Sequence, residues 1–270
     1  MRITAVAAGV LALVLGLSAC GGQSGTGSDG PTLFGDAQEL VRAASAKTDE
    51  VRTAKFSMSG SAAGQELTGT GEGRFGPDTA LSVTTTVAGQ TQEVRIVGGV
   101  VYLKVPEAAL ASTGGKPWAT FAPDSELART LGAALDQAEA NDPAKTLEQV
   151  QRAGTITRSE LTTLDGKPVS HYWVTIEVAK VTDELGGTGL PAPALEQLKS
   201  SDLTYPMELW LDEDQLPVRI TQDTSAIMRA LGAPAEVAQG DVTMDYHDWG
   251  TPVSVEAPPA DQVGELRIGG

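Results

Sequence analysis

The chain has 270 residues, and its 35 acidic and 19 basic side chains leave a net charge of −16. Because such a surface is repelled by phosphate backbones and anionic lipid headgroups, the charge argues against nucleic-acid binding and against membrane attachment through a basic patch. The sequence contains a single cysteine, which excludes intrachain disulfides, so the folded part must be held together by its apolar core.

The first twenty residues have the pattern of an export signal. Arg2 precedes an apolar stretch over residues 5–17, which is too short to span a bilayer as a helix. The sequence LSAC at 17–20 resembles the lipobox of bacterial lipoproteins, in which the cysteine is acylated and becomes the mature N-terminus. We therefore expect residues 1–19 to be a lipoprotein signal peptide and Cys20 to carry the lipid. The alternative is an ordinary secretory signal with an unrelated cysteine behind it.

A stretch rich in glycine and serine separates the signal from the remainder of the chain. Residues 20–31 carry too little apolar surface to fold, which is typical of a flexible tether. From residue 32 the composition is that of a globular protein, and the length suits one large domain over residues 32–270.

The first part of this domain predicts a helix followed by an antiparallel meander. The helix is expected over residues 36–47, because Asp36 can cap it and apolar residues recur behind it at helical spacing. Strands joined by tight glycine turns are predicted over residues 55–62, 66–75, 80–87, 91–97 and 100–105. Residues 71–76 match G-x-G-x-x-G, but no helix follows them, so we predict a strand end and a turn instead of a nucleotide site.

The middle of the chain predicts two helices, over residues 125–140 and 143–152, and the strands then resume. They are predicted over residues 154–164, 168–178, 205–212, 216–223 and 237–249, with short helices at 193–199 and 225–231. Every second residue in several strands is apolar, which is typical of a sheet with one dry face. About ten strands interrupted by helices favour an α+β fold, in which helices cover the concave face of a large curved antiparallel sheet.

Sequence patterns of common enzymes and metal sites are missing. His171 and His247 are the two histidines, and the chain has no HExxH motif, no second cysteine and no G-x-S-x-G motif. We therefore expect no catalytic residues, no metal and no cofactor. An acidic group near a predicted hairpin lacks the spacing of a calcium loop and is interpreted as a solvated turn; it comprises Asp212, Glu213, Asp214 and Asp223. The tryptophans are expected at the edges of the core or at the rim of a cavity; they are Trp118, Trp173, Trp210 and Trp249.

Five segments carry a resemblance to a known family through their order and spacing. They are VYLKVP at 101–106, GKPW at 115–118, DGKPVSHY at 165–172, ELWLD at 208–212 and DYHDWGTPV at 245–253. Together with the lipobox they resemble the LppX/LprAFG family of actinobacterial lipoproteins over most of the mature domain. The resemblance implies a half-barrel of antiparallel strands similar to the carriers LolA and LolB. Helices would close its concave side and leave an apolar cavity between the layers.

Members of that family are lipid carriers at the outer face of the cytoplasmic membrane. The resemblance therefore implies a monomer that is anchored through acylated Cys20, binds a lipid or glycolipid, and passes it to a partner such as a membrane exporter. Burial of each methylene group contributes about 0.8 kcal/mol, so a lipid leaves a bilayer only for an equally apolar enclosure.

Aliphatic residues at alternating strand positions are the candidates to line such a cavity. They are Val83, Val94, Ile96, Val101, Leu103, Val174, Ile176, Leu209, Leu211, Val218 and Ile220. Because the sequence pattern of a cavity lining is nearly that of an ordinary core, the alternative is that these side chains pack a filled interior. The protein would then be a non-enzymatic scaffold of the cell envelope that acts through surface contacts.

Overall fold

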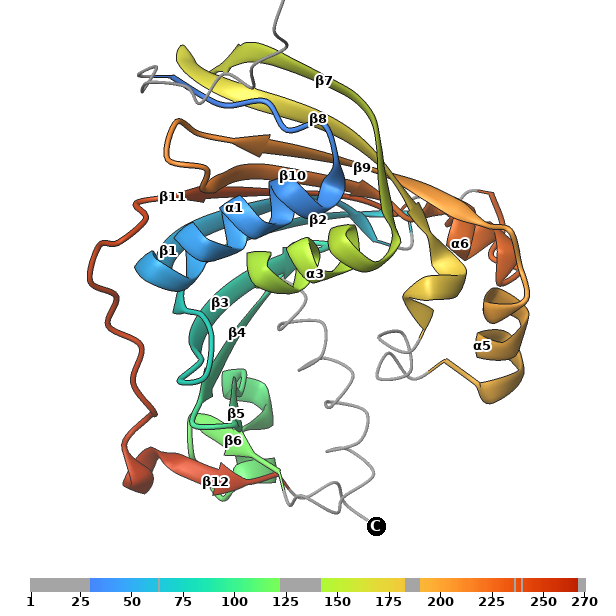
Figure 1. Cartoon of the computed structure of the whole chain (residues 1–270). Helices are drawn as coiled ribbons and strands as arrows, with labels where there is room; N and C mark the ends of the chain where they lie inside the picture. The colour runs from blue at the N-terminus through green and yellow to red at the C-terminus, as the bar shows by residue number, and fades with distance from the viewer. Residues whose placement is uncertain are drawn as a thin grey trace, which may run out of the picture.

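One open, curved sheet organises the molecule. The computed structural model describes residues 30–62, 64–121, 142–182, 190–235, 237–238 and 240–266. Twelve strands form the sheet in the order β12-β6-β5-β4-β3-β2-β1-β11-β10-β9-β8-β7. All neighbouring strands pair antiparallel except β12 and β6, which are parallel. Helices α1 and α3 lie inside the curve of the sheet (Figure 1), which confirms the predicted α+β half-barrel.

The first half of the chain follows the prediction closely. Helix α1 (Ala37–Val51) begins where the Asp36 carboxylate accepts hydrogen bonds from the backbone N–H groups of Gln38 and Glu39. Its last residue, Val51, lies four residues beyond the predicted end, and Arg52 follows in the left-handed conformation. The meander that follows consists of β1 (Thr53–Ala62), β2 (Gln65–Arg74), β3 (Ala80–Val87), β4 (Gln90–Val97) and β5 (Val100–Lys104). Each of these strands agrees with its predicted range to within two residues at either end.

One edge of the sheet contains elements that the sequence did not reveal. They are the 3-10 helix η1 (Glu107–Thr113), β6 (Trp118–Thr120), the 3-10 helix η4 (Ala260–Gln262) and β12 (Val263–Glu265). Strands of three residues are too short to show an alternating pattern, which is why the sheet has twelve strands where about ten were predicted. The helix predicted over residues 125–140 lies outside the described residues.

The second half of the chain returns to the same sheet. Its elements are α3 (Pro143–Ala153), β7 (Gly154–Leu164), β8 (Lys167–Glu177), the 3-10 helix η2 (Val178–Lys180), α5 (Ala192–Lys199), β9 (Thr204–Leu211), β10 (Pro217–Asp223), α6 (Ser225–Ala230) and β11 (Asp241–His247). Strand β11 starts four residues after its predicted start. It pairs with β1 on one side and with β10 on the other, so it joins the two halves of the chain in one sheet.

The apolar core lies between the concave face and the helices. Helix α1 contributes Leu40 and Val41, and α3 contributes Leu147 and Val150, because apolar residues recur along one side of each helix. These side chains share one cluster with the buried residues of β1, β3 and β4 and of β8 to β11. The concave side is therefore the dry face that the alternating sequence pattern predicted.

Glycines in β2 give the concave face its shape. A Cβ atom at Gly71 would lie 2.3 Å from Cζ of Phe56, and one at Gly69 would lie 2.8 Å from Cγ of Met58. The β1 side chains thus occupy space that β2 side chains would otherwise fill. A strand without side chains on one face also bends more easily, which suits a strongly curved sheet. Gly76, the last residue of the G-x-G-x-x-G motif, lies in the turn after β2 with a φ of +94°.

Replacement of Gly71 by alanine is expected to lower the free energy of unfolding by about 1–3 kcal/mol, because the methyl group would overlap the Phe56 ring and the Ser82 carbonyl oxygen. Urea denaturation of the Gly71→Ala variant measures the change. Gly35→Ala is the control, since no atom lies within 4 Å of the place that its methyl group would take, and a change within about 0.5 kcal/mol is expected there. Equal stability of the two variants would contradict the close packing of β1 on β2.

Candidate functional site

Ten of the eleven predicted lining residues lie on one face of the sheet. Residues that pair directly across neighbouring strands share a face, and so do residues two apart along one strand. The direct pairs among the predicted residues are Val83 with Val94, Val94 with Leu103, Ile96 with Val101 and Leu209 with Ile220. Tyr172 pairs with Leu209, which places Val174 and Ile176 on this face, and Leu211 lies on it two residues after Leu209. The registers of β1, β2, β10 and β11 connect these pairs from β8 to β5 without a change of face.

Val218 is the exception. The register of β9 and β10 shifts between Pro217 and Arg219, so Val218 falls in a bulge and has no directly opposed residue in β9. Its side chain is half-buried. The alternating pattern of β10 therefore placed Ile220 on this face correctly. It does not hold for Val218, because the bulge interrupts the alternation between the two residues.

The concave face has a filled part and a half-buried part. Seven of the predicted residues belong to the core cluster that includes the apolar residues of α1 and α3: Val83, Ile96, Val174, Ile176, Leu209, Leu211 and Ile220. Ile176 and Leu209 have no exposed surface at all. On β4 and β5, Val94, Val101 and Leu103 are half-buried, and of these Val94 packs against the cluster. These three side chains therefore keep exposed apolar surface that Ile176 and Leu209 do not have.

Tyr172 fastens the segment before α1 to the concave side of β8. Its hydroxyl donates a hydrogen bond to the Thr32 carbonyl oxygen at 3.0 Å and accepts one from the Phe34 N–H at 3.1 Å. Burial raises the pKa of the Tyr172 hydroxyl above its ordinary value, so the group keeps the proton that it donates. The start of the described chain is thereby held against β8.

The convex face carries an aromatic and charged cluster on β7, β8 and β9. The His171 ring lies between Trp173 and Trp210, with ring centroids 3.6 Å and 4.0 Å apart. Nε2 of His171 lies 2.7 Å from Oε2 of Glu208, and the Arg158 guanidinium lies 4.3 Å from the centre of the Trp173 ring. These two tryptophans therefore lie on the outside of the sheet, where the sequence analysis expected a core edge or a cavity rim. The alternation explains it, because both are out of phase with the buried residues of their strands.

Of the other two tryptophans, Trp249 packs against the core, whereas Trp118 is buried on the convex face, where it pairs with Lys104 and lies beside the Arg95 guanidinium. Trp118 on β6 is 5% exposed, and Trp249 donates a hydrogen bond from its ring N–H to the Pro217 carbonyl oxygen at 2.9 Å. The Trp249 ring also lies beside Phe75 and Tyr246. The prediction for the tryptophans thus holds for Trp249.

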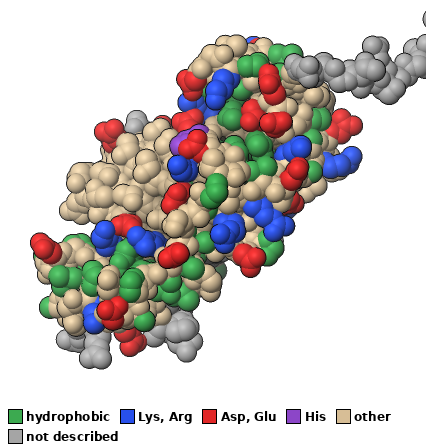
Figure 2. All heavy atoms as spheres, turned by 90° about the vertical axis from the view of Figure 1, so that its left-hand side faces the viewer, with side chains coloured by type: hydrophobic (Ala, Val, Ile, Leu, Met, Phe, Trp, Pro, Cys, Tyr) green, Lys and Arg blue, Asp and Glu red, His purple; other side chains and the backbone are tan. Residues whose placement is uncertain are grey.

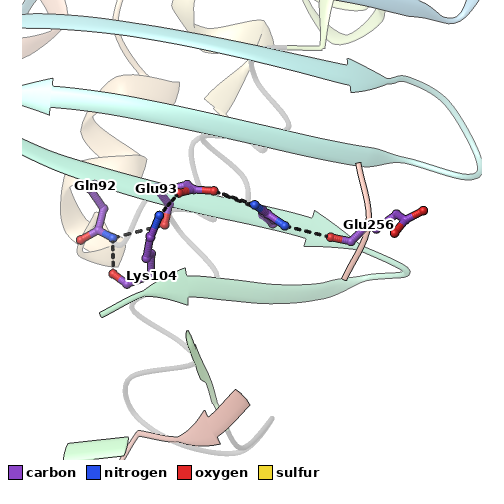
Figure 3. A network of polar contacts seen from close by, with 5 residues as sticks. Gln92, Glu93, Lys104 and Glu256 are labelled. Carbon is purple, nitrogen blue, oxygen red and sulfur yellow. Dashed lines mark hydrogen bonds and ion pairs between the residues drawn. The ribbon is translucent and has the colours of Figure 1, made fainter. Parts of the chain in front are cut away.

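A polar network fixes the C-terminal segment to the convex side of β4 and β5 (Figure 3). Glu93 accepts hydrogen bonds from Lys104 at 2.7 Å and from Arg95 at 2.9 Å. Arg95 also reaches the carbonyl oxygen of Glu256 at 3.5 Å, and its guanidinium lies 4.6 Å from the centre of the Trp118 ring. Burial by itself would raise the pKa of the Glu93 carboxyl, but the hydrogen bonds and charges of Lys104 and Arg95 hold it below its ordinary value.

The acidic group of the sequence is divided between the two ends of β10. Asp212 lies in the turn between β9 and β10, where its carboxylate accepts hydrogen bonds from the N–H groups of Asp214 and Leu216 at 3.0 Å and 2.9 Å. Asp223 is the last residue of β10 and therefore lies at the other end of the strand. Within the described ranges, no three acidic, histidine or cysteine side chains are grouped as a metal site would require. None of the helices in those ranges has the length and apolar character needed to cross a bilayer.

The chain was compared with known protein families, curated proteins and solved structures. No model of a known protein family matches the chain. The chain is 26% identical over 175 residues to an uncharacterized 31.2 kDa protein from the rplA-rplJ intergenic region of Streptomyces griseus. That match covers 62% of this chain and 53% of the relative, so the chain spans about half the length of the curated relative that it matches.

Two solved structures are similar in fold. LprF from Mycobacterium bovis has a TM-score of 0.48 and 15% identity, and the match covers 82% of this chain and 96% of LprF. The lipoprotein LppX from Mycobacterium tuberculosis has a TM-score of 0.45 and 15% identity, with 82% of this chain and 98% of LppX covered. Both names belong to the family that the five sequence segments resemble.

His171 is expected to make stability depend on pH. Burial lowers the pKa of its ring, and Arg158 lowers it further, while Glu208 and Glu160 oppose the shift. The unfolded chain, with a histidine pKa of about 6.5, therefore binds the proton first as the pH falls. The stabilisation from neutral His171 is complete above that pKa and is lost as the pH falls from about 7 toward the lower pKa of the folded state.

Urea unfolding of the parent and of His171→Gln at pH 7.5 and pH 5.5 tests this contribution. The free energy of unfolding is expected to fall less in the variant than in the parent over this interval, because the variant lacks the titrating ring. An identical fall in both proteins would show that His171 has no such role.

Proposed function

We propose that the protein is a membrane-anchored lipoprotein that binds a lipid or lipid-linked molecule on its concave face and carries it across the cell envelope. The observation that supports this most is the continuous apolar face, which gathers ten predicted lining residues on a curved sheet. Its β4–β5 part, with Val94, Val101 and Leu103, is left half-buried.

The chemistry of this half-buried part suits acyl chains. Its three side chains are aliphatic, so they contact methylene groups without needing hydrogen-bond partners. Each methylene that moves from water onto such a surface contributes about 0.8 kcal/mol. Binding and release of a lipid in this way need no covalent chemistry, which agrees with the expectation that the protein is no enzyme. A membrane exporter or another envelope protein would supply or receive the ligand.

The anchor is assigned to Cys20 through the lipobox. Acylation of this cysteine would hold the protein at the outer face of the cytoplasmic membrane, where lipids to be exported become accessible. Nine residues, 21–29, lie between Cys20 and Gly30, the first residue that the structure describes. The domain itself would act as a monomer beside the bilayer.

A scaffold with a filled interior is the second candidate. The seven residues packed with α1 and α3 favour it for their part of the face, because the buried side chains there leave no surface to a ligand. The carrier and the scaffold differ at β4 and β5, where the carrier requires a ligand on Val94, Val101 and Leu103. Substitutions at these three residues therefore distinguish the carrier from the scaffold.

Leu103→Arg is expected to reduce the lipid that co-purifies with the protein at least tenfold, because a charge on the concave face would have to be desolvated against an acyl chain. Mass spectrometry of organic extracts, normalised to protein, measures the bound lipid. Tyr102→Arg is the matched control: Tyr102 is also half-buried and is the next residue of β5, but it lies on the convex face opposite Arg95. Equal lipid in both variants, or none in the parent, would favour the scaffold.

Cys20→Ala is expected to move the protein from the membrane fraction to the soluble fraction, because no acyl chain is then attached. Detergent phase partitioning together with the mass of the mature N-terminal peptide checks both the cleavage before residue 20 and the acylation. The variant domain should still bind lipid after partitioning. A parent protein with an unmodified cysteine would support the ordinary secretory signal instead.

A further inference from the structure

Two exposed leucines occupy one corner of the half-barrel. Among the described residues, three large hydrophobic residues are exposed to solvent. Their exposed fractions are 42% for Leu33, 40% for Val100 and 57% for Leu161. Val100 lies at the start of β5, near one edge of the sheet, whereas Leu161 lies on β7, the opposite edge strand. Leu33 belongs to the segment before α1, which runs beside β7 and β8 (Figure 1).

Hydrogen bonds and strand register bring the two leucines to the same place. The neighbours of Leu33 on both sides are bound through their backbone to the Tyr172 hydroxyl on β8. Leu161 pairs directly with Ser170, two residues before Tyr172 on the same strand. Ser170 and Tyr172 lie on the concave face, so Leu161 continues that face to the edge of the sheet.

The chain also enters the domain at this corner. The ten residue-to-residue steps from Cys20 to Gly30 span at most about 35 Å, which limits how far the corner can move from the site of acylation. Val100, nine strand positions away from β7, is about 43 Å from it measured along the sheet at about 4.8 Å per strand. Of the exposed hydrophobic side chains, Leu33 and Leu161 are therefore the two held nearest to the anchor.

We propose that this corner docks on the bilayer that holds acylated Cys20, with Leu33 and Leu161 inserted at the membrane interface. The inference rests on the proposed function, because it takes the anchor at Cys20 as given. It places the β7 edge of the sheet at the bilayer, and so lengthens the time that the domain spends at the membrane surface where lipid is exchanged. The membrane contact is apolar, since the net charge of −16 opposes attraction to anionic lipids. On the side of the molecule that Figure 2 shows, acidic and basic side chains are interspersed.

The single cysteine of the chain makes a site-specific test practical. Acylation consumes the Cys20 thiol, so Leu161→Cys and Val100→Cys each provide one free thiol in the mature protein. Each variant is labelled with an environment-sensitive fluorophore and reconstituted, with its anchor, in phosphatidylcholine vesicles that contain a nitroxide-labelled lipid. Quenching at position 161 is expected to exceed quenching at position 100 at least threefold. Equal quenching at the two positions would overturn the proposal.

A transfer assay adds a functional readout. The double variant Leu33→Asn, Leu161→Asn is expected to slow transfer of a fluorescent phospholipid from vesicles to the anchored protein at least fivefold, while Val100→Asn leaves the rate unchanged. Lipid bound after long incubation should be the same in all three proteins, because the half-buried β4–β5 surface is untouched. An unchanged transfer rate in the double variant would overturn docking at this corner.

The outcomes separate docking from the carrier function. Quenching at position 161 in a protein that binds no lipid supports the docking surface and refutes the carrier. Lipid binding without quenching at position 161 refutes the docking surface and leaves the carrier standing. A fluorophore at 161 that is shielded without vesicles, in a protein whose mass by light scattering is that of a dimer, would assign the leucines to a contact between two copies and overturn the proposal.

Discussion

The structure depends on one constraint, which is that a curved sheet with a single apolar face must keep that face from water across its whole width. Helices α1 and α3 meet this requirement for part of the face, where Leu40 and Val150 pack with residues such as Ile176 and Leu209. Each Å² of apolar surface removed from water contributes about 25 cal/mol, so this packing is a large share of what holds the fold. Because β4 and β5 carry the face further, its aliphatic surface there remains half-buried and suited to a ligand of the same character.

The two faces of the sheet differ in the kind of side chain that they carry. Aromatic and charged side chains gather on the convex face, where His171 is sandwiched between two tryptophans and Arg219 pairs with Asp245. The C-terminal segment is also held on that side, through the contact of Arg95 with Glu256. Polar interactions, and the C-terminal segment that packs on this side, thus stabilise the convex face of the sheet. The concave face stays apolar from β5 to the edge at Leu161.

Much of this arrangement could be predicted from the sequence because a strand has a period of two. Alternation placed Val83, Val94, Ile96 and Leu103 on one face, and the glycine turns fixed the strand ends to within two residues. The same alternation would have predicted that Trp173 and Trp210 lie on the outer face. They were expected at the core because of their size. Short strands gave no such signal: β12 pairs in parallel with β6 from more than a hundred residues away, and three residues cannot establish a period. Alternation also does not distinguish Ile176, which is fully buried, from Leu103, which is half-buried, because burial depends on which side chains pack against the strand.

The central claim is that an acyl chain lies on the concave face of β4 and β5. A phospholipid analogue with a photoactivatable group in its acyl chain tests this directly, when it is loaded into the protein, activated by light and located by mass spectrometry of the peptides. The account predicts crosslinks at Val94, Val101 or Leu103. Crosslinks confined to convex-face residues such as Tyr102 and Trp210, or their absence after loading, would contradict it.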